Sequence, residues 1–292
     1  MGSPCEIQLF AASPDSARQA VDAAVAEVAR LESRYSRYRD DSILSAINRV
    51  AAAGGEVELD DETAGLIDYA DACHRQSDGL FDISSGILRR VWNFREGRLP
   101  DPQDVRGLLP LVGWDKVAWR RPALGFPRPG MEIDLGGVVK EYAADSVARL
   151  CREAGIRHGV VNLGGDIRVI GPRPGGEGWN VGIRHPRAAD AAVATLTLDR
   201  GGVATSGDYE RCIDIGGVRY GHILNPLTGW PVRHLASVTV VADFCVVAGS
   251  ASTIAILKER DGPAWLDGLG SPHLWIDTRG QSGGTLLAGI GG

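Results

Sequence analysis

Two Leu-Gly-Gly turns, each flanked by an acidic residue, are the part of this sequence best suited to chemistry. The first lies in residues 131–145, MEIDLGGVVKEYAAD, and the second in residues 160–171, VVNLGGDIRVIG. Glycine lets the backbone approach a ligand closely, and the first amides of a following helix point outward and favour an anion. The two turns therefore predict a site for a small anionic ligand.

Four acids lie beside these turns: Asp134, Glu141, Asp145 and Asp166. Carboxylates are hard oxygen donors of the kind that magnesium prefers. The same residues also suit helix caps and solvated surface charges. Their spacing alone leaves both interpretations open.

His222 lies in a well-marked turn within residues 219–232, RYGHILNPLTGWPV. It ends a short predicted strand and precedes Asn-Pro and Thr-Gly pairs, which favour turns. A single histidine is either a proton carrier or a structural residue. Upstream, residues 204–209, ATSGDY, put two hydroxyls and an acid into one predicted turn. Such a turn suits a phosphate or a sugar, or has only a structural role.

Two common nucleotide-binding motifs and two common metal-binding motifs are missing. The sequence contains no GxGxxG and no GxxxxGK[ST], which argues against a standard dinucleotide fold and against a P-loop protein. It contains no HExxH and no CxxC, which removes the commonest zinc sites. The five cysteines are scattered and odd in number, which predicts free thiols in a reducing compartment.

The composition of the 292 residues is that of an ordinary globular protein, with 44% hydrophobic and 23% charged residues. The net charge of −6 argues against a general nucleic-acid binder. The sequence has no run of about 18 apolar residues, so we expect no transmembrane segment. It begins without a signal peptide, so we expect a cytoplasmic protein, or a periplasmic one if a leader has been removed.

The elements that must position these groups divide into early helices and later strands. Helices are expected at residues 14–35, 60–77, 102–110, 139–154 and 248–258, and residues 120–130 read as a loop. An apolar strand is expected directly before the first Leu-Gly-Gly turn. Short strands are expected from residue 159 onward, with closing strands at 273–276 and 285–288. This order predicts an α+β fold with helices packed on antiparallel sheets. We expect a single domain over residues 1–292, with any subdivision near residues 120–130.

Six blocks in this order resemble the ApbE family of flavin transferases, from the first residue to about Lys258. The blocks are SRYSRYRDDSILSAIN, GLFDISSG, DLGGVVKEYAAD, VVNLGGDIRVIG, VATSGDYER and YGHILNPLTGWPV. The resemblance implies an ApbE-like, T-fold-related architecture. It also implies that FAD is the donor and that its FMN half moves onto a threonine or serine hydroxyl of an acceptor protein.

The resemblance assigns residues to the FAD site. It places Met1, Gly2, Tyr38, Phe81 and Asp82 along the flavin and its ribityl chain. It places Asn162, Gly164, Gly165 and Asp166 near the adenosine and the diphosphate, while Thr205, Ser206 and Asp208 complete the pocket. His222 would stand near the scissile phosphoanhydride, where His222 or a nearby acid such as Asp208 would accept the hydroxyl proton.

The resemblance also implies a magnesium ion, and here the chain departs from the family. The ligands would be the carbonyl of Val139, an aspartate on the late helix and Thr253. The family has Ala-Asp in that helix, whereas this chain has Ala248-Gly249, and it has KGYA where this chain has KEYA at residues 140–143. Our hypothesis is that Glu141 replaces the missing aspartate; the alternative is that metal binding is lost.

Three functions follow from these observations. The first is a magnesium-dependent FMN transferase acting on an acceptor protein. The second is an FAD pyrophosphatase that gives FMN and AMP, with water in place of the hydroxyl. The third is a non-catalytic protein that binds or delivers FAD, which the missing aspartate favours.

Overall fold

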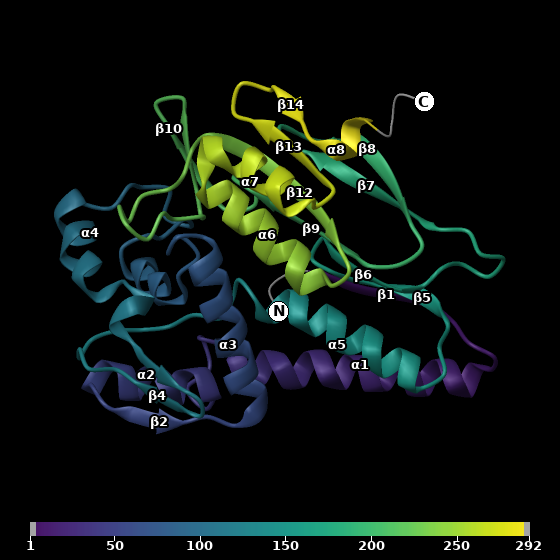
Figure 1. Ribbon diagram of the computed structural model, residues 1–292, viewed down its shortest axis with the longest axis horizontal. Helices are drawn as coiled ribbons and strands as arrows, with labels where there is room; N and C mark the ends of the chain where they lie inside the picture. The colour runs from purple at the N-terminus through teal and green to yellow at the C-terminus, as the bar shows by residue number, and fades with distance from the viewer. Residues whose placement is uncertain (1–3, 289–292) are drawn as a thin grey trace.

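A seven-stranded antiparallel sheet forms the frame of the molecule. The computed structural model describes residues 4–288, and the strand order in this sheet is β1-β5-β6-β9-β12-β13-β14 (Figure 1). The strands are β1 (Cys5–Phe10), β5 (His158–Leu163), β6 (Asp166–Gly171), β9 (Gly202–Gly207), β12 (Leu235–Ala242), β13 (His273–Asp277) and β14 (Ser282–Gly283).

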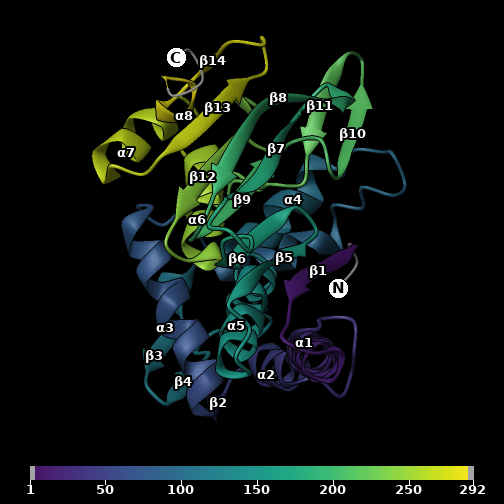
Figure 2. The same cartoon turned by 90° about the vertical axis from the view of Figure 1, so that its right-hand side faces the viewer.

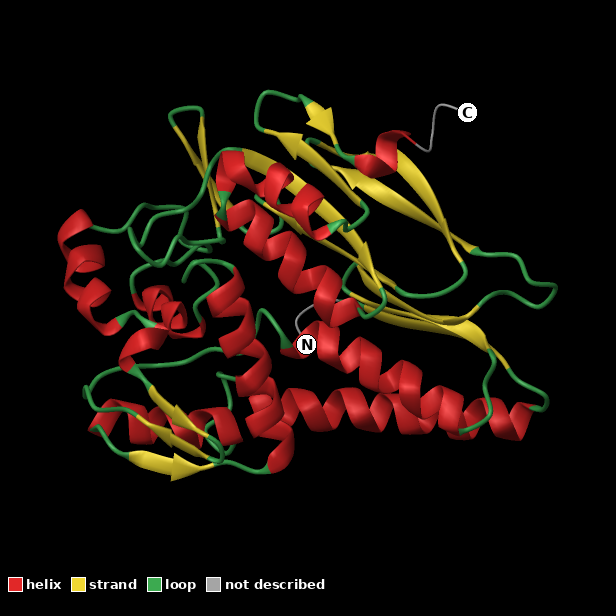
Figure 3. Cartoon of the chain, in the orientation of Figure 1, coloured by secondary structure: helices red, strands yellow, loops and turns green. Residues whose placement is uncertain are grey.

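The long helices pack on one face of this sheet, and the hairpin of β7 (Trp179–His185) and β8 (Ala188–Leu198) packs on the other (Figure 3). The helices are α1 (Pro14–Tyr35), α2 (Ile43–Ala53), α3 (Asp61–Gln76), α4 (Pro102–Leu108), α5 (Val139–Glu153), α6 (Cys245–Leu257), α7 (Gly262–Leu269) and α8 (Thr285–Ala288), with a 3₁₀ helix η1 (Ile83–Arg90). The expected α+β fold with helices on antiparallel sheets is confirmed. No helix within residues 4–288 is both long and apolar enough to cross a membrane.

Two smaller sheets complete the fold. The hairpin of β10 (Cys212–Ile215) and β11 (Val218–Gly221) stands apart from the large sheet (Figure 2). Residues 120–130, expected to be a loop, contain β4 (Ala123–Gly125), which pairs with β2 (Glu56–Glu58) and β3 (Ala118–Arg120). The loop prediction was wrong because Leu124, between the prolines, is completely buried in the main core.

Residues 131–134 do not form the expected strand. The backbone N–H and carbonyl of Ile133 bond to the side-chain amide of Asn48, at 2.8 and 2.9 Å, and the N–H of Asp134 donates to the carbonyl of Ile83. A side chain therefore satisfies the hydrogen bonds that a neighbouring strand would otherwise supply. The expected strand at residues 285–288 is the short helix α8, because β13 pairs with Ser282 and Gly283 instead.

Residues 204–207 belong to strand β9 and not to the predicted turn, since β9 pairs with β12 over the six residues 202–207. Successive side chains on a strand point to opposite faces. Ala204 and Ser206 accordingly lie on the side of α6, while Val203 and Thr205 lie on the side of the β7–β8 hairpin. The two hydroxyls of the predicted turn are thus separated by the sheet.

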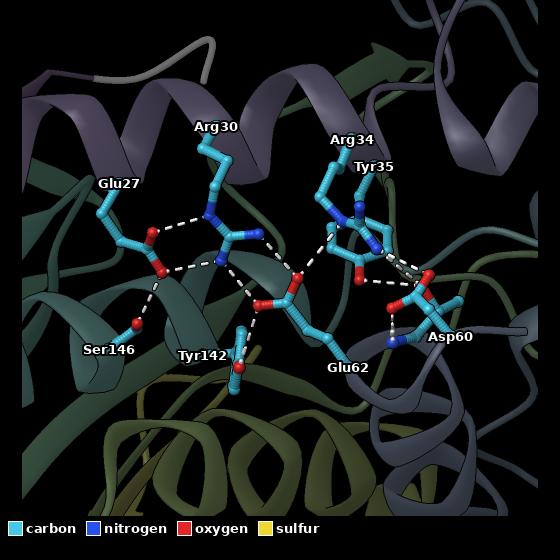
Figure 4. A network of polar contacts seen from close by, with 9 residues as sticks. Glu27, Arg30, Arg34, Tyr35, Asp60, Glu62, Tyr142 and Ser146 are labelled. Carbon is cyan, nitrogen blue, oxygen red and sulfur yellow. Dashed lines mark hydrogen bonds and ion pairs between the residues drawn. The ribbon is translucent and has the colours of Figure 1, made fainter.

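A network of charged side chains joins α1, α3 and α5 (Figure 4). Glu62 of α3 accepts two hydrogen bonds from Arg30, at 2.6 and 2.7 Å, and a longer one from the hydroxyl of Tyr142 on α5. Arg30 also bonds to Glu27, which in turn accepts from Ser146 of α5 at 2.7 Å. Glu62 therefore ties the start of α5 to two other helices.

Replacing Glu62 with alanine should lower the free energy of unfolding by about 1–2 kcal/mol, because it removes several charge-assisted bonds at a partly buried site. Hydrogen bonds to Arg30 lower the pKa of Glu62 below 4.5 in the folded state. Its contribution is therefore present above pH 4.5 and disappears as the pH falls through the lowered pKa. Urea unfolding at pH 7 and pH 3 measures both effects. Glu153→Ala, at an exposed pair with Arg149 on α5, is the control and should cost less than about 0.5 kcal/mol. Equal losses for the two variants would contradict the prediction.

Candidate active site

Asp145 of α5 fixes the position of α6. Its two carboxylate oxygens accept hydrogen bonds from the backbone N–H groups of Cys245 and Val246, at 3.0 and 2.9 Å. The residue preceding α6, Phe244, offers no side-chain cap of its own. A carboxylate at a helix N-terminus satisfies unpaired amides and is favoured by the helix dipole. The buried Arg168 pairs with the same carboxylate at 3.0 Å.

This cap sets Glu141 against Gly249. Glu141 lies one helical turn before Asp145, and Gly249 lies one turn after Cys245. A Cβ atom on residue 249 would lie 2.6 Å from Cγ of Glu141, closer than real Cβ atoms come to other atoms. The side chain of Glu141 therefore occupies the space where a larger side chain of residue 249 would begin. A glutamate at position 141 and a glycine at position 249 therefore fit together sterically.

The carboxylate of Glu141 is buried and only partly satisfied. Glu141 is only 7% exposed, and its Oε2 has no hydrogen-bond partner. Its Oε1 lies 3.6 Å from Nζ of Lys140, which also pairs with Asp166. Burial, and after it the negative charge of Asp166, raises the pKa of Glu141. An unpaired buried oxygen of this kind is suited to bind a cation.

Three hydroxyls lie together where β9 meets α6. Oγ of Ser206 is 2.8 Å from Oγ of Ser252 and 2.9 Å from Oγ1 of Thr253, and Ser252 donates to the carbonyl of Gly249. Val139, the expected carbonyl ligand, is the first residue of α5. These oxygens and Glu141 are of the donor type that magnesium accepts. No group of three His, Cys, Asp or Glu side chains within residues 4–288 is arranged to hold a metal ion.

His222 follows directly after β11 and is partly buried. Its Nδ1 is buried without a hydrogen-bond partner. Burial, followed by the positive charge of Arg211, lowers the pKa of His222 to about 4. The imidazole is therefore neutral at pH 7 and able to accept a proton. Both carboxylate oxygens of Asp208, in contrast, accept hydrogen bonds from the guanidinium of Arg187, at 2.6 and 2.7 Å. In this arrangement Asp208 holds Arg187 and is not a free base.

The residues expected along the flavin differ in their exposure and contacts in the structure. Tyr38 is 78% exposed, and the guanidinium of Arg37 lies 5.1 Å from the centre of its ring. Phe81 is buried, with its ring against Gly137 of the first Leu-Gly-Gly turn. Asp82 is also buried and accepts hydrogen bonds from Ser84 and from the N–H of Trp114, so its carboxylate caps η1. Met1 and Gly2 lie outside the described residues.

The residues expected near the adenosine and the diphosphate, and those expected to complete the pocket, are divided between the two faces of the sheet. Asn162, Gly165 and Thr205 line a cavity of about 340 Å³ between the sheet and the β7–β8 hairpin. Oδ1 of Asn162 accepts from the N–H of Gly165, and Gly164 and Gly165 both have positive φ angles. Asp166 lies on the other face, where it pairs with Lys140. The structure therefore brings Asp166 and Ser206 to the side of Glu141, and Asn162, Gly165 and Thr205 to the opposite side.

Two arginines at this site, Arg37 and Arg211, were not predicted from the sequence. Arg37 pairs with Asp134, the acid of the first Leu-Gly-Gly turn, and its Nη2 donates to the hydroxyl of Tyr38. Arg211 lies close enough to Tyr38 and to His222 to lower the pKa of each. Arg37 stands beside Tyr38 in the first family-like block, and Arg211 is the last residue of VATSGDYER. The position of each arginine within a family-like block was the sequence feature that could have identified it.

Comparison with known proteins shows to which family this chain belongs. The family model described as "ApbE family" matches residues 1–273. The chain belongs to the ApbE family. The FAD:protein FMN transferase of Treponema pallidum is 30% identical over 90% of this chain and 80% of its own length. That of Klebsiella pneumoniae is 32% identical over 83% of this chain and 75% of its own length.

Solved structures show the same fold. The crystal structure of the ApbE protein from Thermotoga maritima superposes with a TM-score of 0.89 and 30% sequence identity, and covers 99% of this chain and 96% of its own. The ApbE-like fold expected from the sequence is thereby confirmed.

Replacing Gly249 with alanine should lower the free energy of unfolding by about 1–3 kcal/mol, because the new Cβ forces the buried Glu141 out of its position. The control is Gly65→Ala in α3, where no heavy atom lies within 4 Å of the new Cβ. That variant should gain about 0.5–1 kcal/mol from helix propensity. Urea unfolding of both variants measures the difference, and equal stability of the two would show that Gly249 is not packed against Glu141.

Proposed function

We propose that this chain is an FAD:protein FMN transferase, which moves FMN from FAD onto a threonine or serine hydroxyl of an acceptor protein and releases AMP. Membership of the ApbE family over residues 1–273 carries the proposal, together with relatives of that name that are 30–32% identical. The neutral His222 and the cationic groups around it support the same chemistry.

Transfer of this kind is phosphoryl chemistry that depends on position and charge more than on covalent help from the enzyme. The oxygen of the acceptor hydroxyl forms a bond to the FMN phosphorus, the bond from that phosphorus to the AMP oxygen breaks, and AMP leaves. His222 accepts the proton of the hydroxyl. Lys140 and Arg211 offset the negative charge of the diphosphate.

Magnesium fits this site through Glu141. The buried Oε2 of Glu141 lacks a partner, and Thr253 lies one helical turn beyond Gly249 with Ser206 against it. Glu141, Thr253 and the carbonyl of Val139 would hold the ion. When bound, the ion neutralises charge on the diphosphate. Glu141 then takes the part of the late-helix aspartate that is typical of the family and absent from this chain.

Incubation with FAD, MgCl₂ and a candidate acceptor protein, followed by mass spectrometry of the acceptor, tests the function. Transfer gives an acceptor whose mass is increased by FMN on a threonine or serine, with one AMP released per adduct. Free FMN and AMP with an unmodified acceptor would make the protein an FAD pyrophosphatase. Intact FAD would make it a binding or delivery protein.

His222→Ala tests the role of His222 as the proton acceptor in the same experiment. Turnover should fall by about 10²–10⁴-fold, the usual contribution of a positioned proton acceptor, while the affinity for FAD should remain close to that of the wild type. If FAD binding disappears and turnover per bound FAD does not change, His222 is a binding residue and not the proton acceptor.

Replacing Glu141 with glutamine should weaken Mg²⁺ binding by about 10-fold or more, because it removes the charge of a ligand and keeps its shape. Calorimetric titration of the FAD-bound protein with MgCl₂ measures this without any turnover. Glu153→Gln, an exposed position on the same helix, should bind Mg²⁺ as the wild type does.

A double variant, Glu141→Gly with Gly249→Asp, returns the carboxylate to α6 and should restore Mg²⁺ affinity. Wild-type affinity in Glu141→Gln would show that Glu141 is not a ligand.

A further inference from the structure

An aromatic cluster connects η1 with the segment that carries His222. Trp92, which is 3% exposed and lies two residues after η1, is its centre. Its ring lies 5.2 Å from that of Trp230 in an edge-on arrangement, and 6.5 Å from that of Tyr220. Phe94 stacks on Trp92 at 5.5 Å. Aromatic pairs at these distances stabilise a specific geometry beyond the area that they bury.

Trp92 contacts the chain on both sides of His222. Tyr220 lies two residues before the histidine, and Trp230 lies eight residues after it. The indole N–H of Trp92 also donates to the carbonyl of Gly229 at 2.8 Å. One side chain of the N-terminal half therefore holds both ends of the segment that contains His222.

The segment after His222 is stiff, so its anchor determines where the histidine lies. The N–H of Val232 donates to the carbonyl of Ile223 at 3.1 Å, and that of Asn225 donates to the carbonyl of Trp230 at 2.9 Å. Gly229 has a φ of +71°, and a Cβ atom there would lie 2.5 Å from Cγ1 of Val105 on α4. The turn is thus closed on itself and seated against α4.

The imidazole of His222 is oriented directly only in part. The backbone of Arg211 interacts with the ring, but Nδ1 is buried and makes no hydrogen bond. In many catalytic histidines a hydrogen bond to the second ring nitrogen sets the orientation. Without one at Nδ1, the orientation of this ring also depends on the backbone to either side, which Trp92 contacts.

We propose that Trp92 is a positioning residue for His222. This inference rests on the proposed function, since it concerns how the proton acceptor of that reaction is held. Trp92 also ties the histidine to η1, whose first turn is capped by Asp82 next to Phe81. Trp92 thereby connects the histidine to the segment that contains Phe81 and Asp82, two of the residues expected along the flavin.

The test is Trp92→Phe, which removes the indole N–H and keeps an aromatic ring. Trp119→Phe is the matched control, because Trp119 also donates one 2.8 Å hydrogen bond, to Asp68 on α3, far along the chain from His222. In protein with ¹⁵N-labelled histidine, Trp92→Phe should move the His222 imidazole resonances, identified by their loss in His222→Ala. Trp119→Phe should leave them unchanged.

Release of AMP from FAD, common to transfer and hydrolysis, is the second measurement. Trp92→Phe should lower its kcat by about 10-fold through misplacement of the acceptor group and change the Kd for FAD by less than about twofold. In the His222→Ala background it should have no further effect, since residues acting through one group are not additive.

Equal losses in both backgrounds, or unmoved His222 resonances, would overturn the inference. If His222→Ala keeps full activity, the proposed role of His222 fails, and the resonances still decide whether Trp92 positions it. If Trp92→Phe does not fold, Trp230→Phe trims the same cluster from the other side and should shift the same resonances.

Discussion

The capping of α6 by Asp145 is the interaction on which the rest of the candidate site depends. Helix α6 begins without a cap from its own segment, so its first amides depend on a carboxylate from α5. This contact fixes α5 and α6 relative to each other at one point. The regular spacing of residues along each helix then determines which residues meet farther along. Glu141 meets Gly249 as a result, and the next turn of α6 brings Thr253 to Ser206. One carboxylate thus aligns the oxygen groups contributed by three separate elements.

The large sheet divides the chemistry of the site between its faces. Lys140, Glu141, Asp166 and Ser206 lie on the helical side, where charges are close and buried. The opposite face carries a cavity whose lining includes the neutral polar residues Asn162 and Thr205 as well as Glu6 and Arg173. Between the two sets, at the end of strands β5 and β6, lies the Gly164–Gly165 turn, whose positive φ angles favour glycine and whose backbone carries no side chains.

Short sequence patterns predicted those elements whose hydrogen bonds lie within a few residues of each other along the chain. The helix predicted over residues 14–35 agrees with α1, because Ser13 caps its first turn and Pro14 begins it, a pair of residues typical of a helix start. The strand at residues 131–134 could not be excluded from its own sequence, because its partner is the side chain of Asn48, far along the chain. Strand β9 was read as a turn because Thr, Ser and Gly are common in turns, whereas its pairing with β12 decides its state. The ordered blocks indicated candidate site residues, but the pairing of Asp208 with Arg187 is a tertiary contact that no spacing predicts.

The close approach of Glu141 to Gly249 also constrains which residues can stand together at these two positions. A Cβ atom at residue 249 would lie 2.6 Å from Cγ and 3.1 Å from Cδ of Glu141. With the buried Glu141 in place, a side chain at residue 249 requires the glutamate or the helices to move. Positions 141 and 249 must therefore be redesigned as a pair, and a carboxylate placed on α6 needs a small residue at position 141.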